Sequence, residues 1–506
     1  MSAIPLPQDP NLSQLRNQAR ELQRATRAGD AQAIAIAAEY SPDTPPSPLF
    51  PLSAAQLVTA RRYGFASWAR LRRYVEIIEA RAWTAEPTPG DEPPPDRFLR
   101  LACLTSGNDE GSDRAAAAQL LSTYPELSGA SVHLAAACAD VDGVRRFLAA
   151  DPAAATAPGG PHGWSPLLYQ AYARHDPRIG LDATLLTARL LLDAGADPND
   201  GRFWHGLPTP FTVLTGVLSY GDHDQPWHPH SIPFARLLLD AGADCNDGQA
   251  LYNRMFGPND DHLVLLFEFG LGRGDGGPWH RLLGDKLESP AQMLRELLRW
   301  AVLHDQRDRV ELLAAHDVDL SAPFSGQRYG PYGRTPAEEA LVNGHRELAA
   351  RLAALTGTKP TLNEVDAFVA ASLAGDADQV RRTAPAVIAE ARRTRPGLVT
   401  WAASQGAPNA VELLVSAGFD VNSFGRSDIP ADQPWHTALH VAAGDGNLAL
   451  ARKLLALGAE PWLRDRHYDA TPLGWARRHG HQPLIDLLTD CPATSGGTAA
   501  GPCGRG

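Results

Sequence analysis

Short runs of apolar residues recur along the chain in an order that predicts paired helices. Residues 188–201 (ARLLLDAGADPNDG) and 235–248 (ARLLLDAGADCNDG) differ only at Pro198 against Cys245. Weaker copies of this segment occur at 310–320, 411–422 and 451–462. In each copy the apolar residues have helical spacing and polar turn residues follow. The pattern therefore predicts a short amphipathic helix that ends in a turn.

A second element, in which Ser or Thr precedes small and apolar residues, comes before several of these runs. It occurs as SPLLYQA (165–171), TPFTVL (209–214), TPAEEA (335–340), TALHVAA (437–443) and TPLGWA (471–476). A Ser or Thr side chain caps a first turn and Pro fits the first helical position, so each copy predicts a helix start. Gly195 and Gly242 are predicted to end the second helices in the left-handed conformation.

Helix pairs this short cannot bury an apolar face alone, so neighbouring pairs must stack into a solenoid. The order of the two elements resembles the ankyrin repeat, whose pattern is TPLHxAA, a glycine and LLLxxGADxN. The resemblance covers residues 98–490 in about eleven units. It implies an all-α ankyrin-repeat solenoid of stacked helix pairs with projecting hairpins or loops. The motif histidine of the family matches only His440 and His133.

The two ends of the chain differ from the repeats. Residues 1–85 are predicted to form a helical N-terminal cap, and ARRYGFASWARLRR (60–73) resembles the element that precedes ankyrin arrays in bacterial proteins. Residues 86–97 are rich in Pro and acidic residues and are predicted to form an extended linker. The composition of residues 491–506 predicts a disordered tail. A stripe of arginines on the first helix (Arg16, Arg20, Arg24 and Arg27) is either a solvated face or a site for an anionic partner.

Composition narrows the class of protein without indicating chemistry. The 506 residues carry a formal net charge of −12, which argues against nucleic acid as the main partner. No apolar run approaches the roughly 20 residues that span a bilayer, and Met1 to Pro10 lacks the segments of a secretory signal. The five cysteines have no metal-like spacing. We therefore expect a cytoplasmic monomer that has no cofactor and no membrane partner.

Spacing identifies two insertions within the array. Ser165 to Gly195 is 30 residues and Thr209 to Gly242 is 33, against 21 from Thr437 to Gly458. The excess is about nine and twelve residues, and such insertions often serve binding. The second insertion, 220–232, contains residue types that suit zinc or nickel, although a solvated polar loop is the alternative and no metal ligand is assigned. These residues are His223, Asp224, His228 and His230.

The connections between repeats are rich in the aromatic and arginine side chains that dominate binding hot spots. They lie at 200–208, 324–334, 424–436 and 464–470. The candidate partner-binding residues are Trp204, His205, Arg328, Tyr329, Tyr332, Arg426, Trp435, Arg466 and Tyr468. The alternative is that these aromatics fold back onto the adjacent helix.

Three functional hypotheses follow. The first is a non-enzymatic intracellular scaffold or adaptor that binds an unidentified protein through the repeat fingers and the concave helix face. The second is a metal- or small-ligand-binding regulator that uses the His-rich insertion 220–232. The third is an enzyme with an unrecognised site, for which the sequence offers no nucleophile–base pair or catalytic motif.

Overall fold

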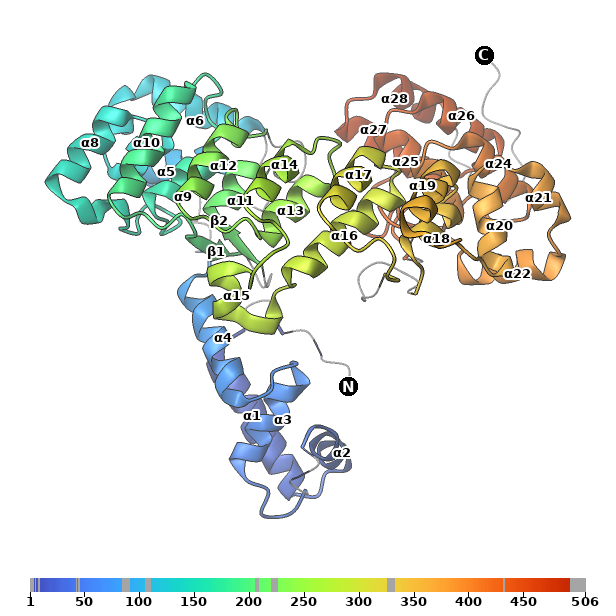
Figure 1. Cartoon of the computed structure of the whole chain (residues 1–506), viewed down its shortest axis with the longest axis horizontal. Helices are drawn as coiled ribbons and strands as arrows, with labels where there is room; N and C mark the ends of the chain where they lie inside the picture. Colours follow the sequence, from blue (N-terminus) through green and yellow to red (C-terminus); the bar gives the residue numbers. More distant parts are fainter. Residues whose placement is uncertain are drawn as a thin grey trace. The chain divides into compact units, whose positions relative to one another are not determined.

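The computed structural model describes most of the chain as short helices (Figure 1). The described residues are 4, 6–7, 10–41, 43, 46–83, 92–104, 111–204, 209–219, 226–324, 333–430 and 433–491, without the side chains of 111 and 112. They form two compact units, residues 1–293 and 294–506. Among the described residues one pair of three-residue strands accompanies the helices, so the predicted all-α fold is confirmed.

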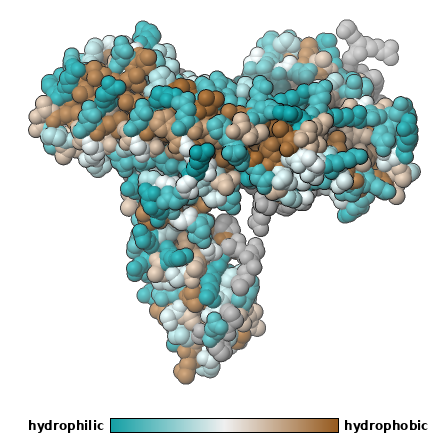
Figure 2. Space-filling model, in the orientation of Figure 1, coloured by the Kyte–Doolittle hydropathy of each residue, from teal (hydrophilic) through white to brown (hydrophobic). Residues whose placement is uncertain are grey.

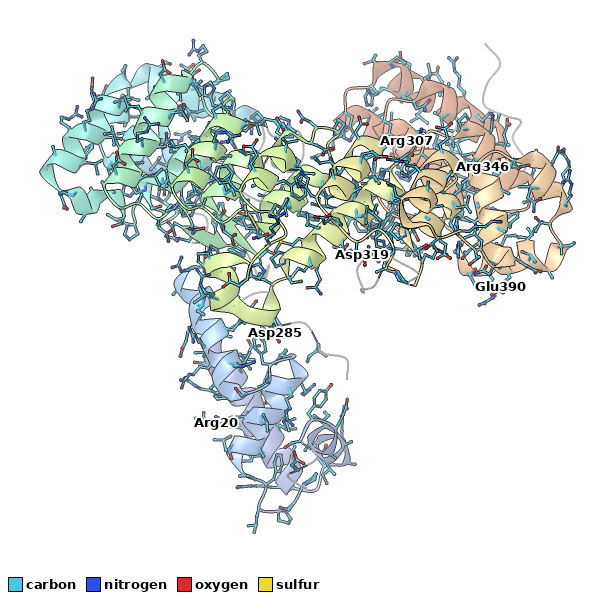
Figure 3. The ribbon with its side chains drawn as sticks, in the orientation of Figure 1. Arg20, Asp285, Arg307, Asp319, Arg346 and Glu390 are labelled. Carbon is cyan, nitrogen blue, oxygen red and sulfur yellow. The ribbon has the colours of Figure 1, made fainter. Side chains whose placement is uncertain are left out.

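The first unit begins with four helices that carry their own apolar contacts. They are α1 (Leu12–Arg27), α2 (Ala31–Tyr40), α3 (Leu52–Arg62) and α4 (Trp68–Ala80). Asn11 caps α1 by accepting hydrogen bonds from two first-turn N–H groups. Leu15 and Leu71 are buried in a core that also contains Phe203 and Trp279, so these helices pack on the later part of the same unit. Arg20 lies on the exposed side of α1 (Figure 3).

The remainder of the first unit is a stack of helix pairs. Its elements are α5 (Pro94–Ala102), α6 (Gly111–Thr123), η1 (Pro125–Gly129), α7 (Val132–Ala137), α8 (Val141–Ala150), η2 (Pro152–Ala155), α9 (Pro166–Tyr172), α10 (Leu181–Asp193), β1 (Gly201–Phe203), β2 (Pro210–Thr212), α11 (Val213–Leu218), α12 (Ser231–Asp240), α13 (Gly248–Met255), α14 (Asp261–Glu268), α15 (Gly277–Leu283) and η3 (Gly284–Lys286). Helices α7, α9, α11 and α13 lie side by side in this order, as do α8, α10, α12 and α14. Two parallel layers of helices result, as in a solenoid.

The second unit repeats this arrangement. Helix α16 (Pro290–Leu303) crosses the boundary between the units and is followed by α17 (Arg307–Ala315), α18 (Pro336–Val342), α19 (Arg346–Thr356), α20 (Glu364–Leu373), α21 (Ala377–Arg382), α22 (Pro385–Thr394), α23 (Leu398–Ser404), α24 (Pro408–Ser416), α25 (Ala438–Gly444), α26 (Leu448–Ala456), α27 (Pro472–Arg478) and α28 (Gln482–Thr489). Helices α23, α25 and α27 lie side by side. Exposed ion pairs such as Arg346–Asp376 bridge neighbouring repeats, and polar and apolar side chains are interspersed over the visible face of each unit (Figures 2 and 3).

The predicted helix starts are confirmed at several repeats. The Thr335 hydroxyl accepts from the Glu338 N–H, and the Glu338 carboxylate accepts from the Thr335 N–H at 2.9 Å, which forms a capping box. In the last Thr-led motif, the Thr471 hydroxyl caps α27 by accepting from the Gly474 N–H. His440 accepts at Nδ1 from the Thr437 hydroxyl and donates from Nε2 to the Ala470 carbonyl, 3.0 Å away. The motif histidine therefore joins its helix to the following connection.

The helix start predicted at Thr209 is wrong by three residues. Pro210 to Thr212 form β2, which pairs antiparallel with β1, and Thr212 caps α11 by accepting from the Thr215 N–H at 3.0 Å. With Thr212 as the cap, the distance to Gly242 is 30 residues, the same as from Ser165 to Gly195. The two repeats therefore carry insertions of equal length and follow a common period of 47 residues.

Two further local expectations need correction. Residues 94–97 are not extended, because α5 begins at Pro94 and proline is tolerated at the first helical position. Residues 86–91 of the predicted linker and 492–506 of the predicted tail lie outside the described residues. At α9 the Ser165 hydroxyl donates to the Asp200 carboxylate at 2.7 Å and does not cap the helix.

Asparagines in the GADxN segments join consecutive repeats. Asn199 donates from Nδ2 to the Gly242 carbonyl at 2.9 Å and accepts at Oδ1 from the Asp244 N–H at 2.8 Å. Asn422 makes the equivalent pair of bonds to Gly458 and Glu460. One side chain thus satisfies both a backbone donor and a backbone acceptor of the next turn. This explains why the segment reads the same in different repeats.

Gly195→Val is expected to lower the free energy of unfolding by about 1–2 kcal/mol or more. Gly195 follows the end of α10 with φ +96°, and no atom lies within 4 Å of the position a Cβ would take. The cost is therefore backbone strain and not a clash. Gly195→Asn should lose less, because asparagine tolerates the left-handed region. Denaturant melts of both variants test this, and equal losses would show that φ is not the cause.

Candidate functional site

The finger between α24 and α25 presents an arginine stacked on a tryptophan. Gly425 and His436 pair across its base, with the Gly425 N–H donating to the His436 carbonyl at 2.8 Å. The Arg426 guanidinium lies over the Trp435 ring, 3.9 Å from its centroid. An ion pair with Asp428 holds the same guanidinium from the other side. The backbone pairing and the ion pair together fix the Trp435 ring at the rim of the finger.

The next finger, between α26 and α27, is organised around Asp465. Its buried carboxylate accepts from the N–H groups of His467 (2.8 Å) and Ala470 (3.1 Å) and from the Trp475 indole N–H (3.0 Å). Burial raises the pKa of Asp465, but these hydrogen bonds and one from the Tyr468 N–H lower it below its usual range. The charged carboxylate therefore fixes the turn that presents His467 and Tyr468.

The two fingers meet and form one continuous stack, which we call the finger stack: Arg426, Trp435, His467 and Tyr468. The Trp435 and His467 rings are parallel, with 5.0 Å between centroids and 2° between planes. Tyr468 contacts His467 edge-on at 4.5 Å. The Arg466 N–H donates to the Trp435 carbonyl at 2.8 Å, which connects the two backbones. Three of the four members are candidates from the sequence, and the fourth, His467, lies in the same segment.

The finger stack is exposed at its His467–Tyr468 end, whereas the Arg426 side chain is only 14% exposed. Tyr468 is 60% exposed, and Trp435 is half-buried between Arg426 and His467. Arg466 is exposed and lies over the Phe424 ring, 4.6 Å from its centroid. Cation–π contacts of this kind position an arginine without neutralising its charge. The surface therefore combines a fixed aromatic face with a positive charge, which are features of binding hot spots.

Trp204 lies elsewhere and has a different environment. It belongs to the first unit, where its ring contacts that of Trp83 edge-on at 5.0 Å. The Trp83 ring also contacts the Trp164 ring at 4.4 Å, and the backbone N–H of Trp83 donates to the Phe203 carbonyl at 2.8 Å. Trp204 thus folds onto an aromatic cluster that joins the segment after α4 to the β1–β2 hairpin. This agrees with the alternative that these aromatics fold back onto the repeats. The candidates His205, Arg328, Tyr329 and Tyr332 lie outside the described residues.

The described part of the His-rich insertion is engaged in local hydrogen bonds. His230 donates from Nε2 of its ring to the Ile179 carbonyl at 2.8 Å, and the backbone N–H of His230 donates to Nδ1 of His228 at 3.1 Å. Burial lowers the pKa of His228 well below its usual value. His223 and Asp224 lie outside the described residues. Within the part of the chain that is described, no group of three or more His, Cys, Asp or Glu is placed to hold a metal ion.

None of the described helices is both long enough and apolar enough to cross a lipid bilayer.

The stacked helix pairs define an all-α repeat solenoid, and comparison with known proteins finds ankyrin repeats in its last part. Residues 399–496, which include both fingers of the finger stack, match the family model for ankyrin repeats in 3 copies. A putative ankyrin repeat protein, L271 of Acanthamoeba polyphaga mimivirus, is 37% identical over 82 residues, 16% of this chain and 10% of that protein. The E3 ubiquitin-protein ligase Ufd4 of Drosophila melanogaster is 38% identical over 94 residues, 18% of this chain and 3% of that protein. The matches thus span a tenth or less of these relatives' length.

Proposed function

We propose that this chain is a non-enzymatic protein–protein interaction scaffold that binds a protein partner through the finger stack. Ankyrin repeats at 399–496 support a role in protein interaction. The observation that carries the proposal is the stack itself, in which two consecutive fingers present Arg426, Trp435 and Tyr468 together. The match to the Drosophila ligase covers 3% of that protein, so its name gives no support for ligase activity here.

The energetics favour this surface as a binding hot spot. Trp, Tyr and Arg are enriched among hot-spot residues, and Trp and Tyr bury much area at a small cost in side-chain entropy. In the finger stack this cost is already reduced, since Arg426 and His467 hold Trp435 from its two faces. Arg466 adds an exposed cation next to the stack, so an acidic side chain of a partner would find a charged group there.

We also propose the domain organisation and cellular context that the sequence predicts. Residues 1–85 form an N-terminal cap, 86–97 a linker whose last four residues begin α5, and 98–490 the repeat array of a cytoplasmic monomer. The cap is supported by the core that α1 and α4 share with Phe203 and Trp279. This core lies at β1 and α15, within the array, so the N-terminal helices cover apolar surface there and not at the first helix pair, α5 and α6.

Trp435→Ala and Tyr468→Ala are each expected to weaken partner binding by about 1–4 kcal/mol. The partner is first identified by affinity capture from the native cell and then purified. Calorimetric titration of the full chain with that partner gives the change in affinity. Arg466→Ala should act in the same direction, because it removes the exposed cation of the surface.

Tyr124→Ala provides the matched control, because Tyr124 is 46% exposed and lies in the first unit. Its affinity for the partner should equal that of the wild type. Circular dichroism melts establish that each variant is folded. A folded Trp435→Ala, Tyr468→Ala double variant that keeps wild-type affinity would contradict the proposal. Trp204→Ala, by contrast, should reduce stability, since Trp204 packs on Trp83.

A further inference from the structure

A cavity of about 290 Å³ lies in the first unit between the two insertions. Residues from α6, from the ends of α7 and α9, and from the insertions around Pro177 and Pro229 line it. Most of the lining side chains are apolar, with five alanines, three prolines and Ile179. The body of any molecule bound there would therefore contact mainly small apolar groups.

One buried guanidinium of this cavity lacks a carboxylate partner. Arg174 is 7% exposed, and the four hydrogen bonds it makes all go to backbone carbonyls. They are at Ala171 (2.8 Å), Ala173 (2.9 Å), Gly216 (2.6 Å) and Pro226 (3.2 Å). A guanidinium has five N–H groups, so one remains unused. The carbonyls satisfy hydrogen bonds but leave a full positive charge inside the protein.

A second arginine adds to this charge. Arg114 of α6 lines the same cavity, and its buried Nη1 has no hydrogen-bond partner. Burial lowers the pKa of Arg174 to about 9, and the charge of Arg114 is a smaller cause in the same direction. The carboxylate in the lining, Asp176, is already bonded to Arg178 at 2.9 and 3.0 Å. Two like charges therefore share one cavity, and among the described residues its lining offers no free carboxylate to offset them.

The histidines of the cavity do not change this balance. Burial lowers the pKa of His175 to about 4 and that of His228 well below its usual value, so both are neutral at pH 7. They can donate or accept hydrogen bonds but add no charge. The two guanidinium groups therefore favour an anionic ligand in this cavity.

We propose that this cavity binds a compact organic carboxylate, either a free acid or the C-terminal carboxylate of a peptide. The planar carboxylate has two oxygens, one for the unused N–H of Arg174 and one for Arg114. The small apolar walls accommodate the attached carbon body. This inference does not depend on the finger stack, which lies in the other unit. It is a form of the hypothesis that the insertion binds a small ligand, with an organic anion as the ligand and not a metal ion.

The test uses the purified full chain and probes in charged and neutral pairs. Benzoate is titrated against benzamide, and N-acetyl-dialanine against its C-terminal amide, by calorimetry. At least one acid should bind saturably, with its neutral partner about tenfold weaker or more. Binding of benzoate indicates a free acid as ligand, and binding of the peptide acid alone indicates a C-terminus. Both results support the proposal.

Arg114→Gln is the diagnostic variant, because Arg114 is only partly buried and its Nη1 makes no hydrogen bond that the substitution would remove. It should weaken binding of the acid about tenfold or more. Arg189→Gln, which removes an exposed arginine of α10 outside the cavity, should leave binding unchanged. Failure of both acids to bind, equal binding of acid and amide, or full affinity of Arg114→Gln would each overturn the proposal.

Discussion

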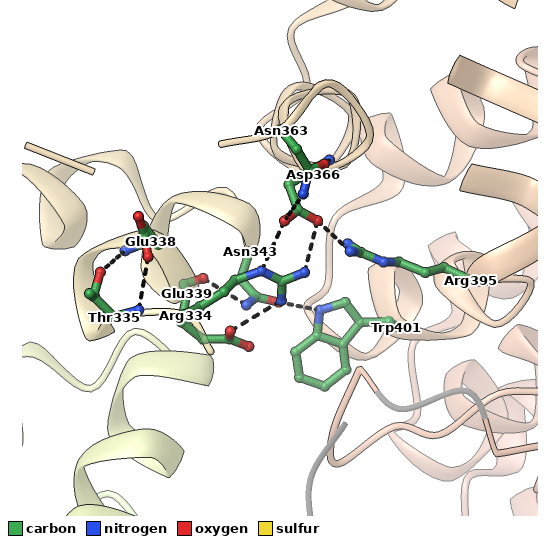
Figure 4. Close-up of polar contacts among 9 residues, drawn as sticks. All are labelled: Arg334, Thr335, Glu338, Glu339, Asn343, Asn363, Asp366, Arg395 and Trp401. Atoms are coloured by element: carbon green, nitrogen blue, oxygen red, sulfur yellow. Dashed lines mark hydrogen bonds and ion pairs between the residues drawn. The ribbon is translucent and has the colours of Figure 1, made fainter. Parts of the chain in front are cut away.

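Asp366→Ala is expected to lower the free energy of unfolding by about 3–5 kcal/mol, the largest effect we predict for a single substitution. The Asp366 side chain is 8% exposed and is the centre of a polar network (Figure 4). Arg334 donates to both of its oxygens, at 3.1 and 2.8 Å, and Arg395 pairs with Oδ1. Removing the carboxylate takes away the anionic partner that the largely buried guanidinium groups of Arg334 and Arg395 share.

The carboxylate is charged in the folded state despite its burial. Burial raises the pKa of Asp366, but the hydrogen bond from Arg334 and the charges of Arg395 and Arg334 outweigh it and hold the pKa below its usual range. The charged form is therefore the form that stabilises the fold. Glu339, which accepts from Arg334 at 3.2 Å, provides only one further charge and cannot replace Asp366.

The control for this prediction is Asp378→Ala on the neighbouring helix α21. Asp378 pairs with Arg381, but both side chains are more than two-thirds exposed, at 68% and 69%. Exposed pairs contribute about 0–1 kcal/mol, so this variant should melt close to the wild type. Denaturant unfolding at pH 7 measures both. Equal stabilities of the two variants would show that the Asp366 network does not stabilise the fold.

Acidification from pH 7 to 5 is expected to destabilise the protein by several kcal/mol. Burial lowers the pKa of four histidines to about 4: His162, His175, His304 and His436. In the unfolded chain their pKa is about 6.5, so between pH 6.5 and 4 the unfolded state binds more protons. Stability is therefore full above about pH 6.5 and is lost as the pH falls, by about 1–2 kcal/mol for each histidine at pH 5.

His162→Phe tests one histidine directly. His162 is 2% exposed, lies 4.6 Å from the Trp164 ring, and neither ring nitrogen has a hydrogen-bond partner. Phenylalanine should fill the same aromatic site and remove the proton uptake. The variant should lose less stability than the wild type between pH 7 and 5 in denaturant melts. An unchanged pH dependence would contradict a buried neutral His162.

Much of the fold could be predicted because its signals are local. A capping Thr and a terminal Gly act within a few residues, so α18 and the end of α10 follow from the sequence. Thr209 has the same local signal as Thr335, but pairing of β2 with β1 moves the helix start to Thr212. That pairing is a contact between separate segments, which a single motif does not encode.

The candidate site could be predicted in residue type but not in arrangement. Arg426, Trp435 and Tyr468 follow from the composition of the connections, yet their stacking depends on how far apart two repeats place their fingers. Trp204 has the same composition signal but packs on Trp83, which comes from a segment without repeats. The cavity at Arg174 has no motif at all, because its charge balance appears only once the insertions are folded.

Site-specific photo-cross-linking at position 468 tests the central claim most directly. Benzoylphenylalanine replaces Tyr468 in one full-length chain and the exposed Tyr124 of the first unit in another, and both are irradiated with the purified partner. We expect a covalent one-to-one product from position 468 and none from position 124, because Tyr468 is 60% exposed at the end of the finger stack. A product from position 124 with none from position 468 would contradict the finger stack as the partner-binding surface.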